Sequence, residues 1–248
     1  MTTLDDHSRY LLYANFVETE TAWAHIKALE SVILTYGVGL TYYVDSHSIF
    51  RFVSHRDSIW QKQTKMTDEV LTQWKRVVKK CGIQVWHTLS AQAKGKIERP
   101  YRWLQDRIIR RCAREHVDGI SQGRVVLQQE LHRYNAEQIH SATGEIPWIR
   151  LQKAVMEGRN FFKPFKLLPA YQSTKDIFCL HESRKVNGYN QISWNGSIIP
   201  LPMSLPQGTE IELHIVPQAD RVEVRLWHQE RVVKVIHFKK ESTTLKLT

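Results

Sequence analysis

The sequence predicts an α/β protein that continues into an all-β region. From residue 9 to residue 134, short apolar runs alternate with longer amphipathic segments, which is the order of a sheet covered by helices. From residue 176 to residue 240, short apolar runs follow one another with only polar turns between them. Residues 160–170 (NFFKPFKLLPA) carry two prolines and separate the two regions. We therefore expect an α/β layer, a helical extension with a linker, and a small barrel or sandwich.

Each element of the α/β layer has its own signal. Runs such as LTYYV (40–44) are typical of buried strands, while apolar residues repeated every three or four positions indicate helices. Gly37 and Gly82 supply two expected helix ends. In the long basic helix, we expect Tyr101 and Leu104 to belong to a stripe that faces the core. The predicted elements are the strands 9–17, 40–44 and 83–87 and the helices 20–36, 70–81, 97–114 and 124–134.

The all-β region is predicted from one turn signal and three alternating segments. Asn195-Gly196 lies between two apolar runs, and this dipeptide is typical of a two-residue hairpin turn. The segments TEIELHIV, RVEVRLWH and RVVKVIHF then follow with short polar turns between them. Several short strands within about 65 residues favour a small barrel.

Composition and charge limit the classes of function. The 248 residues are 42% hydrophobic and 24% charged, as in folded globular proteins. The net charge of +10 favours polyanionic partners, nucleic acid first. No apolar run approaches the ~20 residues that span a membrane, and MTTLDDHSRY lacks the features of a signal peptide. We therefore expect a cytoplasmic protein without a membrane anchor.

Cysteine and histidine give no metal-site signal in the sequence. Cys81, Cys112 and Cys179 are far apart, and no C-x-x-C occurs, so we expect neither disulfides nor a zinc finger. The 12 histidines are scattered without metal-ligand spacing. We expect them to be exposed or satisfied by ordinary hydrogen bonds.

One basic stretch carries an acid that needs an explanation. Residues 94–114 contain eight basic residues and two acidic ones, Glu98 and Asp106. In one interpretation Glu98 pairs with Arg102 on a solvated helix, which is worth a few tenths of a kcal/mol. In the other it binds a metal ion among residues that hold phosphates. Asp45, at the carboxyl end of a predicted strand, is a second candidate acid, and carboxylates suit Mg²⁺.

Four segments favour the second interpretation through a resemblance. LDDHSRYLL (4–12), YVDSHSIF (43–50), QAKGKIERPYRWLQ (92–105) and YNAEQIHSATGEIPWIR (134–150) resemble, in the same order, segments of DDE transposases and retroviral integrases. The likeness is to bacterial insertion-sequence transposases in particular. Residues 184–202 (RKVNGYNQISWNGSIIPLP) more loosely resemble the small barrel that follows the core in Mu-like members.

The resemblance implies a domain organisation and a fold. It implies a partial RNase H-like integrase core over 1–120, a helical extension and linker over 121–175, and a small SH3-like β-barrel over 176–240. Because the chain begins after the family's first strand, we expect the core to lack that strand and the catalytic Asp on it. Asp5 and Asp6 are not substitutes, since the resemblance puts them at a turn between strands.

The resemblance also implies site residues, a cofactor and partners. Asp45 and Glu98 are 53 positions apart and correspond to the second and third catalytic acids, which bind Mg²⁺ or Mn²⁺. Lys94, Lys96, Arg99 and Arg102 would contact phosphates of transposon-end and target DNA. Intact relatives act as homo-oligomers in the bacterial cytoplasm, in association with the nucleoid.

Three functions follow as expectations. The first is DNA transposition, in which metal-dependent phosphodiester hydrolysis precedes strand transfer; without the first acid we expect weak or absent metal binding and no activity from this chain alone. The second is a non-catalytic DNA-binding remnant or regulator of the parent transposase. The third, an RNase H-like nuclease unrelated to transposition, is disfavoured by residues 134–150. Whether this chain is itself an enzyme stays open.

Overall fold

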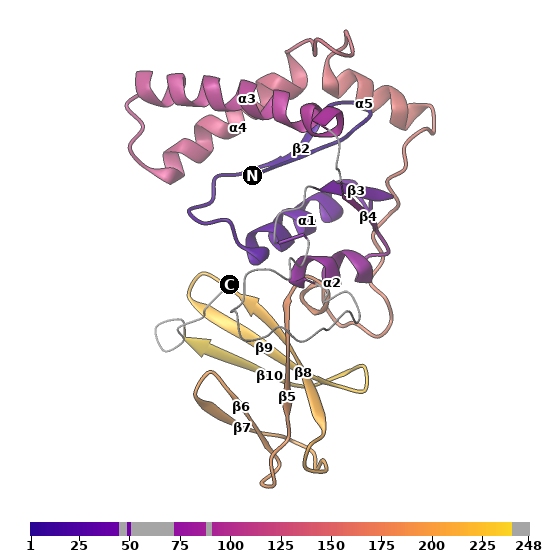
Figure 1. The fold of residues 1–248 in the computed structure, drawn as a ribbon, viewed down its shortest axis with the longest axis vertical. Coiled ribbons are helices and arrows are strands. Elements are labelled where there is room, and N and C mark those ends of the chain that lie inside the picture. Colours follow the sequence, from indigo (N-terminus) through magenta and orange to yellow (C-terminus); the bar gives the residue numbers. More distant parts are fainter. Residues whose placement is uncertain (45–48, 51–71, 88–90, 240–248) are drawn as a thin grey trace. The chain divides into compact units, whose positions relative to one another are not determined.

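The computed structural model describes residues 1–44, 49–50, 72–87 and 91–239 (Figure 1). The chain divides into two compact units. The N-terminal unit comprises residues 1–20, 28–50 and 83–165, and the C-terminal unit comprises residues 21–27, 51–82 and 166–248.

The N-terminal unit contains two small sheets. Strands β1 (Thr2–Leu4) and β2 (Leu11–Ala14) form an antiparallel hairpin, and β3 (Thr41–Val44) pairs in parallel with β4 (Gln84–His87). Among the described residues, neither pair is hydrogen-bonded to a further strand. Asp5 lies in the turn of the hairpin, as the sequence predicts.

The first three helices of this unit follow the predicted order, and α5 (Pro147–Met156) was not among the individual helices predicted from the sequence. The first three are α1 (Ala22–Tyr36), whose residues from 28 onward belong to this unit, α3 (Ala91–Arg114) and α4 (Ile120–Ala136). Gly37 ends α1 with a φ of 102°, and a side chain there would approach the carbonyl oxygen of Lys163 to 2.6 Å. Only glycine fits this position without strain.

The core of the N-terminal unit lies between the β1–β2 hairpin and helices α3 and α4. Its buried members are Leu11, Ala14, Leu104, Ile108, Leu127 and Tyr134. The predicted core position of Tyr101 is wrong, because its side chain is 46% exposed. Pro100 is buried instead, four residues before Leu104, so the stripe follows the i, i+4 spacing of a helix one residue earlier.

Polar side chains of α4 cover the outer edge of β2. Asn135 donates to the carbonyl oxygen of Leu11 at 3.0 Å and accepts from its N–H at 2.9 Å. Gln128 donates to the carbonyl oxygen of Ala14, and Arg124 donates to that of Phe16. These bonds satisfy edge groups that would otherwise lack a partner strand.

The C-terminal unit is built from six strands. Four of them form an antiparallel sheet in the order β10-β9-β8-β5, and the other two form the separate hairpin β6–β7. Asn195 and Gly196 turn this hairpin with φ values of 47° and 77°, as the Asn-Gly signal predicts. The strands are β5 (Leu180–Lys185), β6 (Gln191–Trp194), β7 (Ser197–Pro200), β8 (Glu210–Pro217), β9 (Arg221–His228) and β10 (Arg231–Lys239).

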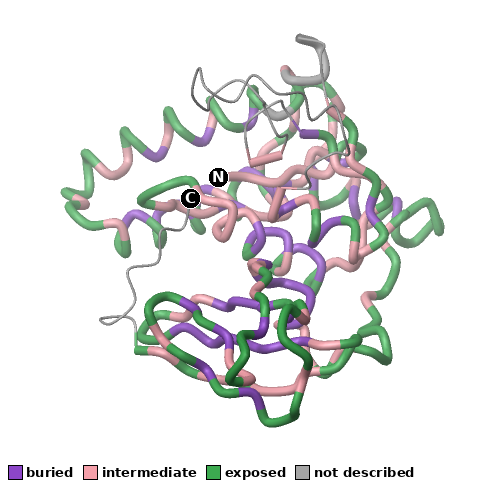
Figure 2. The backbone as a smooth tube through the Cα atoms, turned by 60° about the horizontal axis from the view of Figure 1, so that its bottom comes forward, coloured by how far each residue is buried: buried purple, intermediate pink, exposed green. Residues whose placement is uncertain are grey.

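The apolar faces of the sheet and the hairpin share one core (Figure 2). Ile192 and Ile199 of the hairpin are buried in it with Leu213 and Leu226 of the sheet. In the described part of the chain the strands do not close into the expected barrel, because β6 and β7 are hydrogen-bonded only to each other. The region is therefore all-β as predicted, with two packed sheets in place of a closed barrel.

The other face of the four-stranded sheet is polar and is covered within the same unit. The short 3-10 helix η1 (Thr174–Asp176) places Asp176 against Arg225 of β9, with Nε 2.5 Å from Oδ1. Helix α2 (Gln73–Lys80) bonds to the edge strand β5, since Gln73 both donates to and accepts from the backbone of His181. In the described residues, no helix is both long and apolar enough to cross a membrane.

Candidate nucleic-acid interface and its acidic residue

The predicted site lies where the parallel strand pair leads into α3. Val44 of β3 is paired with His87 of β4, so both strands end at the same edge of their sheet. The long helix α3 begins soon afterwards, at Ala91. Carboxyl ends of parallel strands are the usual location of sites in α/β proteins. Asp45, the predicted second acid, lies outside the described residues.

Glu98, the predicted third acid, is accessible on α3. Its side chain is 53% exposed, and its Oε2 lies 3.9 Å from a guanidinium nitrogen of Arg102. The ordinary i, i+4 pair is therefore present, but at this distance and exposure it contributes about 0–0.5 kcal/mol. The carboxylate is not held by this pair and is available to another ligand.

The predicted phosphate-binding residues differ in their surroundings. Arg99 is exposed, and the Arg102 side chain is 80% exposed. Lys96 is also exposed, but its Nζ lies 2.9 Å from Oδ1 of Asp6 in the β1–β2 turn. The side chain of Lys94 lies outside the described residues, although its backbone belongs to α3.

Asp6 is an ion-pair partner of Lys96 that the sequence analysis did not predict. Arg9 donates to its Oδ1 at 2.6 Å, and Lys96 approaches the same carboxylate. Partial burial raises the pKa of Asp6, but the hydrogen bonds from Lys96 and Arg9 outweigh burial and hold the pKa below its usual value. Asp6 is therefore a charge partner within a basic cluster. Its position 90 residues before Lys96 gave no sequence signal of this contact.

Positive charge also affects a nearby histidine. The pKa of His140 is lowered, first by partial burial and then by the positive charges of Arg9 and Arg99. These residues come from three separate segments of the N-terminal unit. A positive potential at this point is the electrostatic setting that a phosphate backbone requires.

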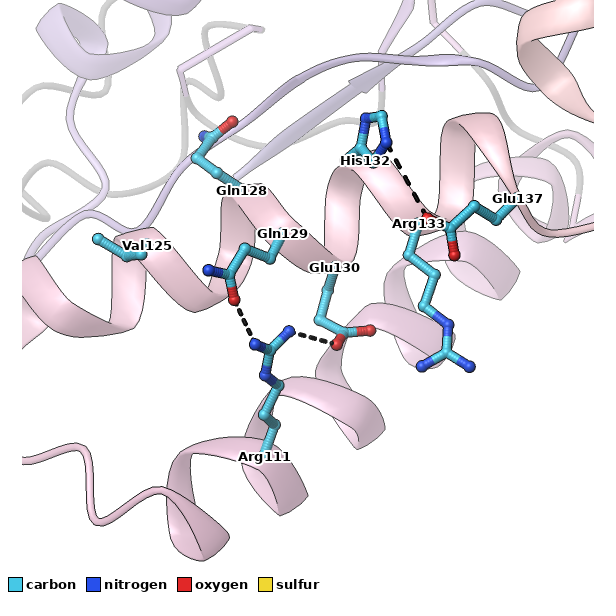
Figure 3. Close-up of a pocket in the computed structure, with 8 residues that line it drawn as sticks. All are labelled: Arg111, Val125, Gln128, Gln129, Glu130, His132, Arg133 and Glu137. Atoms are coloured by element: carbon cyan, nitrogen blue, oxygen red, sulfur yellow. Dashed lines mark hydrogen bonds and ion pairs between the residues drawn. The ribbon is translucent and has the colours of Figure 1, made fainter.

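The second half of α3 is occupied by structural contacts. Arg111 binds Glu115, the residue directly after α3, at 2.7 Å. It also binds Glu130 at 3.0 Å and Gln129, both on α4 (Figure 3). Arg111, Gln129 and Glu130 line an open hollow of about 670 Å³ between the two helices. Since its central arginine is fully engaged, we assign the hollow a role in holding α3 to α4.

A second group of side chains lies in the C-terminal unit. Cys179, His181 and His214 are buried, and one ligand atom of each lies within 4.8 Å of the others. The sequence predicted scattered histidines with no metal-ligand grouping, which is wrong for these two. The spacing Cys-x-His, with the cysteine directly before β5, is a weak local signal, and the third residue is brought in by strand pairing.

Comparison with known proteins gives two transposases. The chain is 28% identical over 200 residues to a protein of Sinorhizobium fredii named transposase y4bF, a match that covers 80% of this chain and 38% of that protein. It is 26% identical over 134 residues to the transposase for insertion sequence IS1202 of Streptococcus pneumoniae, covering 54% of this chain and 28% of that protein. The predicted resemblance to transposases is thus confirmed. The chain spans less than two fifths of the length of either relative.

Comparison with solved structures gives weaker similarities than these sequence matches. The match to the catalytic core domain of BIV integrase covers 63% of this chain and 88% of the integrase chain, with a TM-score of 0.45 and 19% sequence identity. A second match is to a chain of the simian T-cell lymphotropic virus intasome in complex with PP2A regulatory subunit B56 gamma. It covers 96% of this chain and 68% of that chain, with a TM-score of 0.47 and 10% sequence identity. No family model matches the chain.

Proposed function

We propose that this relative of transposases acts in DNA transposition and that residues 1–120 form a partial integrase-type, RNase H-like catalytic core. The observation that carries the proposal is the sequence match to a transposase over 80% of the chain. The accessible Glu98 on a basic helix supports it, because acids beside phosphate-binding residues are what phosphoryl transfer requires. Residues 121–175 and 176–240 are proposed as the helical extension with linker and as a DNA- or protein-contacting module.

Each residue of the site has a proposed role. Arg99, Arg102 and Lys94 bind phosphates of the DNA backbone, and Lys96 does so after exchanging its contact with Asp6 for a phosphate. Glu98 is a metal-binding acid, and Asp45 is its proposed companion. Such contacts fix the position of the backbone without reading its sequence.

Glu98 fits a hard divalent cation. Mg²⁺ takes oxygen ligands, and the carboxylate of Glu98 is half exposed, with one distant ion-pair partner, Arg102, among the described residues. When bound, Mg²⁺ or Mn²⁺ would stabilise the attacking and leaving oxygens of a phosphodiester. The basic residues around Glu98 meanwhile hold the phosphate close to that carboxylate and offset the repulsion between them.

DNA binding measured across a salt series tests the phosphate contacts. We expect affinity for a duplex to fall steeply with salt, and Arg99→Ala and Arg102→Ala each to reduce the slope of log K against log salt by about 1. Arg159→Ala is the matched control, since this exposed arginine pairs with Glu157 far from α3 in the sequence. Binding that is independent of salt, or equal slopes in all three variants, would overturn the proposed interface.

Glu98→Gln separates the catalytic role from the surface ion pair. Without metal, loss of the negative charge should strengthen DNA binding; with Mg²⁺ or Mn²⁺, any nicking or joining of DNA should disappear. A surface carboxylate without a metal role would leave such activity unchanged. DNA binding with no nicking in the unaltered chain, at any Mn²⁺ concentration, would instead favour a non-catalytic regulator.

A further inference from the structure

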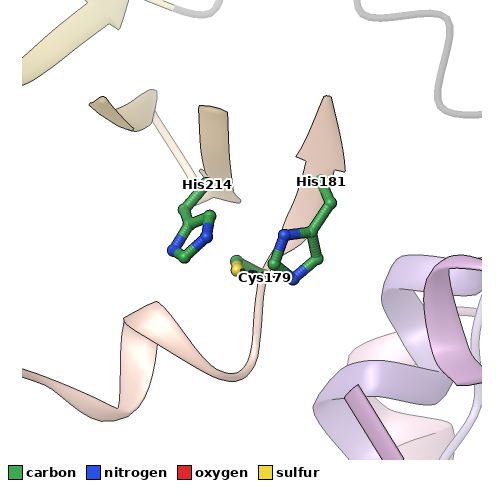
Figure 4. Close-up of side chains that lie close together, drawn as sticks. All are labelled: Cys179, His181 and His214. Carbon is green, nitrogen blue, oxygen red and sulfur yellow. Dashed lines mark hydrogen bonds between the residues drawn. The ribbon is translucent and has the colours of Figure 1, made fainter. Parts of the chain in front are cut away.

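The polar face of the C-terminal sheet holds sulfur and nitrogen side chains that the proposed transposition chemistry does not use. His181 of β5 and His214 of β8 are direct partners in the antiparallel register, so their rings project on the same face. Glu212 precedes His214 by two positions on β8 and therefore lies on that face as well. Cys179 comes directly before β5, and its Sγ lies beside the ring of His181. Two short segments thus bring Cys179, His181 and His214 close together, as Figure 4 shows, with Glu212 as a fourth potential metal ligand beside them.

The distances are those of ligands around one small cation. Sγ of Cys179 lies 3.5 Å from Nε2 of His181. In a tetrahedral zinc site, Zn–S bonds of ~2.3 Å and Zn–N bonds of ~2.0–2.1 Å hold the two ligand atoms about 3.6 Å apart. The rings of His181 and His214 are edge to face with centroids 4.6 Å apart, and the three ligand atoms lie within 4.8 Å of one another.

Glu212 orients one of the two histidines. Its Oε1 lies 2.7 Å from Nδ1 of His181, so this nitrogen carries the proton and Nε2 directs its lone pair toward Cys179. A carboxylate on the far nitrogen of a metal-binding histidine is the usual outer partner in zinc sites. Glu212 is itself 47% exposed, so solvent reaches this side of the group.

His214 has an unmet hydrogen-bonding capacity that points to a ligand. Its side chain is 1% exposed, and in the described structure neither ring nitrogen has a hydrogen-bond partner. The nearest acceptor, Oε1 of Glu212, is 3.5 Å from Nε2, which is long for a hydrogen bond. Buried polar groups without partners are rare and call for an explanation such as an ion.

We propose that Cys179, His181 and His214 bind one Zn²⁺ ion and that Glu212 positions His181. Three protein ligands with a solvent-accessible fourth position are a known zinc arrangement.

The consequence of the site is structural. Cys179 and His181 lie at the beginning of β5, where the linker joins the sheet, and His214 lies on the neighbouring strand β8. One ion bound to all three would fasten the edge strand β5 to the sheet. Binding energy of this kind adds directly to the stability of the folded unit.

The test measures metal content and metal spectra of the whole chain, purified without a histidine tag. We expect one zinc per chain by elemental analysis, and Co²⁺ substitution should give tetrahedral d–d bands with a thiolate charge-transfer band. Cys179→Ser should remove that band, and His214→Gln should lower the zinc content well below one per chain. Cys81→Ser and His237→Gln are matched controls from the same unit and should retain full zinc.

Two further measurements keep the proposal falsifiable if a variant folds poorly. Chelation of the unaltered chain should lower the thermal midpoint of the C-terminal unit, and Zn²⁺ should restore it. Glu212→Gln, which leaves all three ligands, should weaken zinc binding about 10–100-fold. A folded chain that takes up neither Zn²⁺ nor Co²⁺ at micromolar concentration would overturn the site, and uptake of copper with no zinc would overturn the metal assignment.

Discussion

In each unit the amide side chain of one residue forms hydrogen bonds to the backbone of an edge strand, but the sheets to which these two strands belong differ in size. In the N-terminal unit Asn135 bonds to both backbone groups of Leu11 on β2, and in the C-terminal unit Gln73 bonds to both backbone groups of His181 on β5. β2 belongs to a two-stranded sheet, whereas β5 belongs to a four-stranded one. A two-stranded hairpin is marginal in water, while three or more strands with an apolar face support themselves.

The two units are stabilised by different elements. The β1–β2 hairpin depends on α3 and α4, whose residues Leu104 and Leu127 complete its core. The four-stranded sheet packs on the β6–β7 hairpin and uses its second face for a buried polar network. The N-terminal unit therefore relies on helix packing, and the C-terminal unit on its own strands. Four pairs of substitutions break or sharpen this contrast.

The largest effect is expected from Asp176→Ala in the C-terminal unit. Asp176 is fully buried, binds Arg225 through both oxygens and accepts two backbone N–H groups at 3.0 Å. Removing it leaves the buried guanidinium of Arg225 with Glu223 as its remaining carboxylate partner and leaves two backbone N–H groups without their acceptor, which we expect to cost about 3–5 kcal/mol in urea unfolding. Asp106→Ala, which removes an exposed pair with Arg110 on α3, should change stability by no more than about 0.5 kcal/mol. Similar losses in both variants would show that the polar face does not stabilise the sheet.

Asn135→Ala and Gln73→Ala test how much the amide side chain on each edge strand contributes to stability. Asn135 and Leu11 are both buried, so the alanine leaves one N–H and one carbonyl group without partners, at a cost of about 2–4 kcal/mol. Gln73 bonds at a partly exposed position, where water can replace it, so we expect about 1 kcal/mol. Hydrogen exchange should show faster opening of β1–β2 in the first variant and of β5 alone in the second. A larger loss for Gln73→Ala would reverse the contrast.

Acid should weaken the C-terminal unit through Glu223. Burial raises the pKa of this carboxyl, but hydrogen bonds from Lys175 and Arg225 outweigh burial and leave the pKa below its ordinary value. A carboxyl with a depressed folded pKa adds stability above its unfolded pKa, near 4.3, and loses it as the pH falls through the folded pKa. Glu223→Gln should therefore flatten the loss of stability below about pH 4, measured by urea midpoints across pH. The exposed Glu210→Gln is the control, and equal flattening there would contradict this assignment.

Local signals predicted much of the fold. The Asn195-Gly196 turn and the strands around it were readable because the residues that form them are adjacent. Helix α1 was predicted to within two residues of its observed start. In α3 the predicted core residues Leu104 and Ile108 are buried, but Pro100 takes the place predicted for Tyr101. Pro100 and Tyr101 are adjacent and both apolar, so the sequence pattern did not distinguish them.

The site was predicted in part. Glu98 and Arg102 were identified through a motif in one segment, and their exposure agrees with the proposed roles. The contact of Lys96 with Asp6 and the grouping of His181 with His214 both join residues distant in sequence. The second depends on strand register, in which a slip of one residue would turn His214 to the other face. Sequence alone does not determine that register.

The smallest effect compares the same substitution at two glycines. Gly95 lies within α3, and a methyl group added there would meet nothing within 4 Å. Alanine is favoured over glycine in a helix by about 0.5–1 kcal/mol, so Gly95→Ala should stabilise the N-terminal unit by that amount. Gly196 has a φ of 77°, so Gly196→Ala should destabilise the C-terminal unit by about 1–2 kcal/mol. Thermal unfolding of both variants should show a raised midpoint for Gly95→Ala and a lowered midpoint for Gly196→Ala.

The pair also tests the DNA interface. A helix gains stability from losing this glycine, so its presence three residues before Glu98 is unexplained by folding alone. If DNA lies along this part of α3, the missing side chain lets the phosphate backbone approach the helix closely. Gly95→Ala should then weaken DNA binding even though it stabilises the protein, whereas Gly196→Ala should leave DNA binding unchanged. Unchanged DNA binding in a stabilised Gly95→Ala variant would place the DNA path elsewhere on the N-terminal unit.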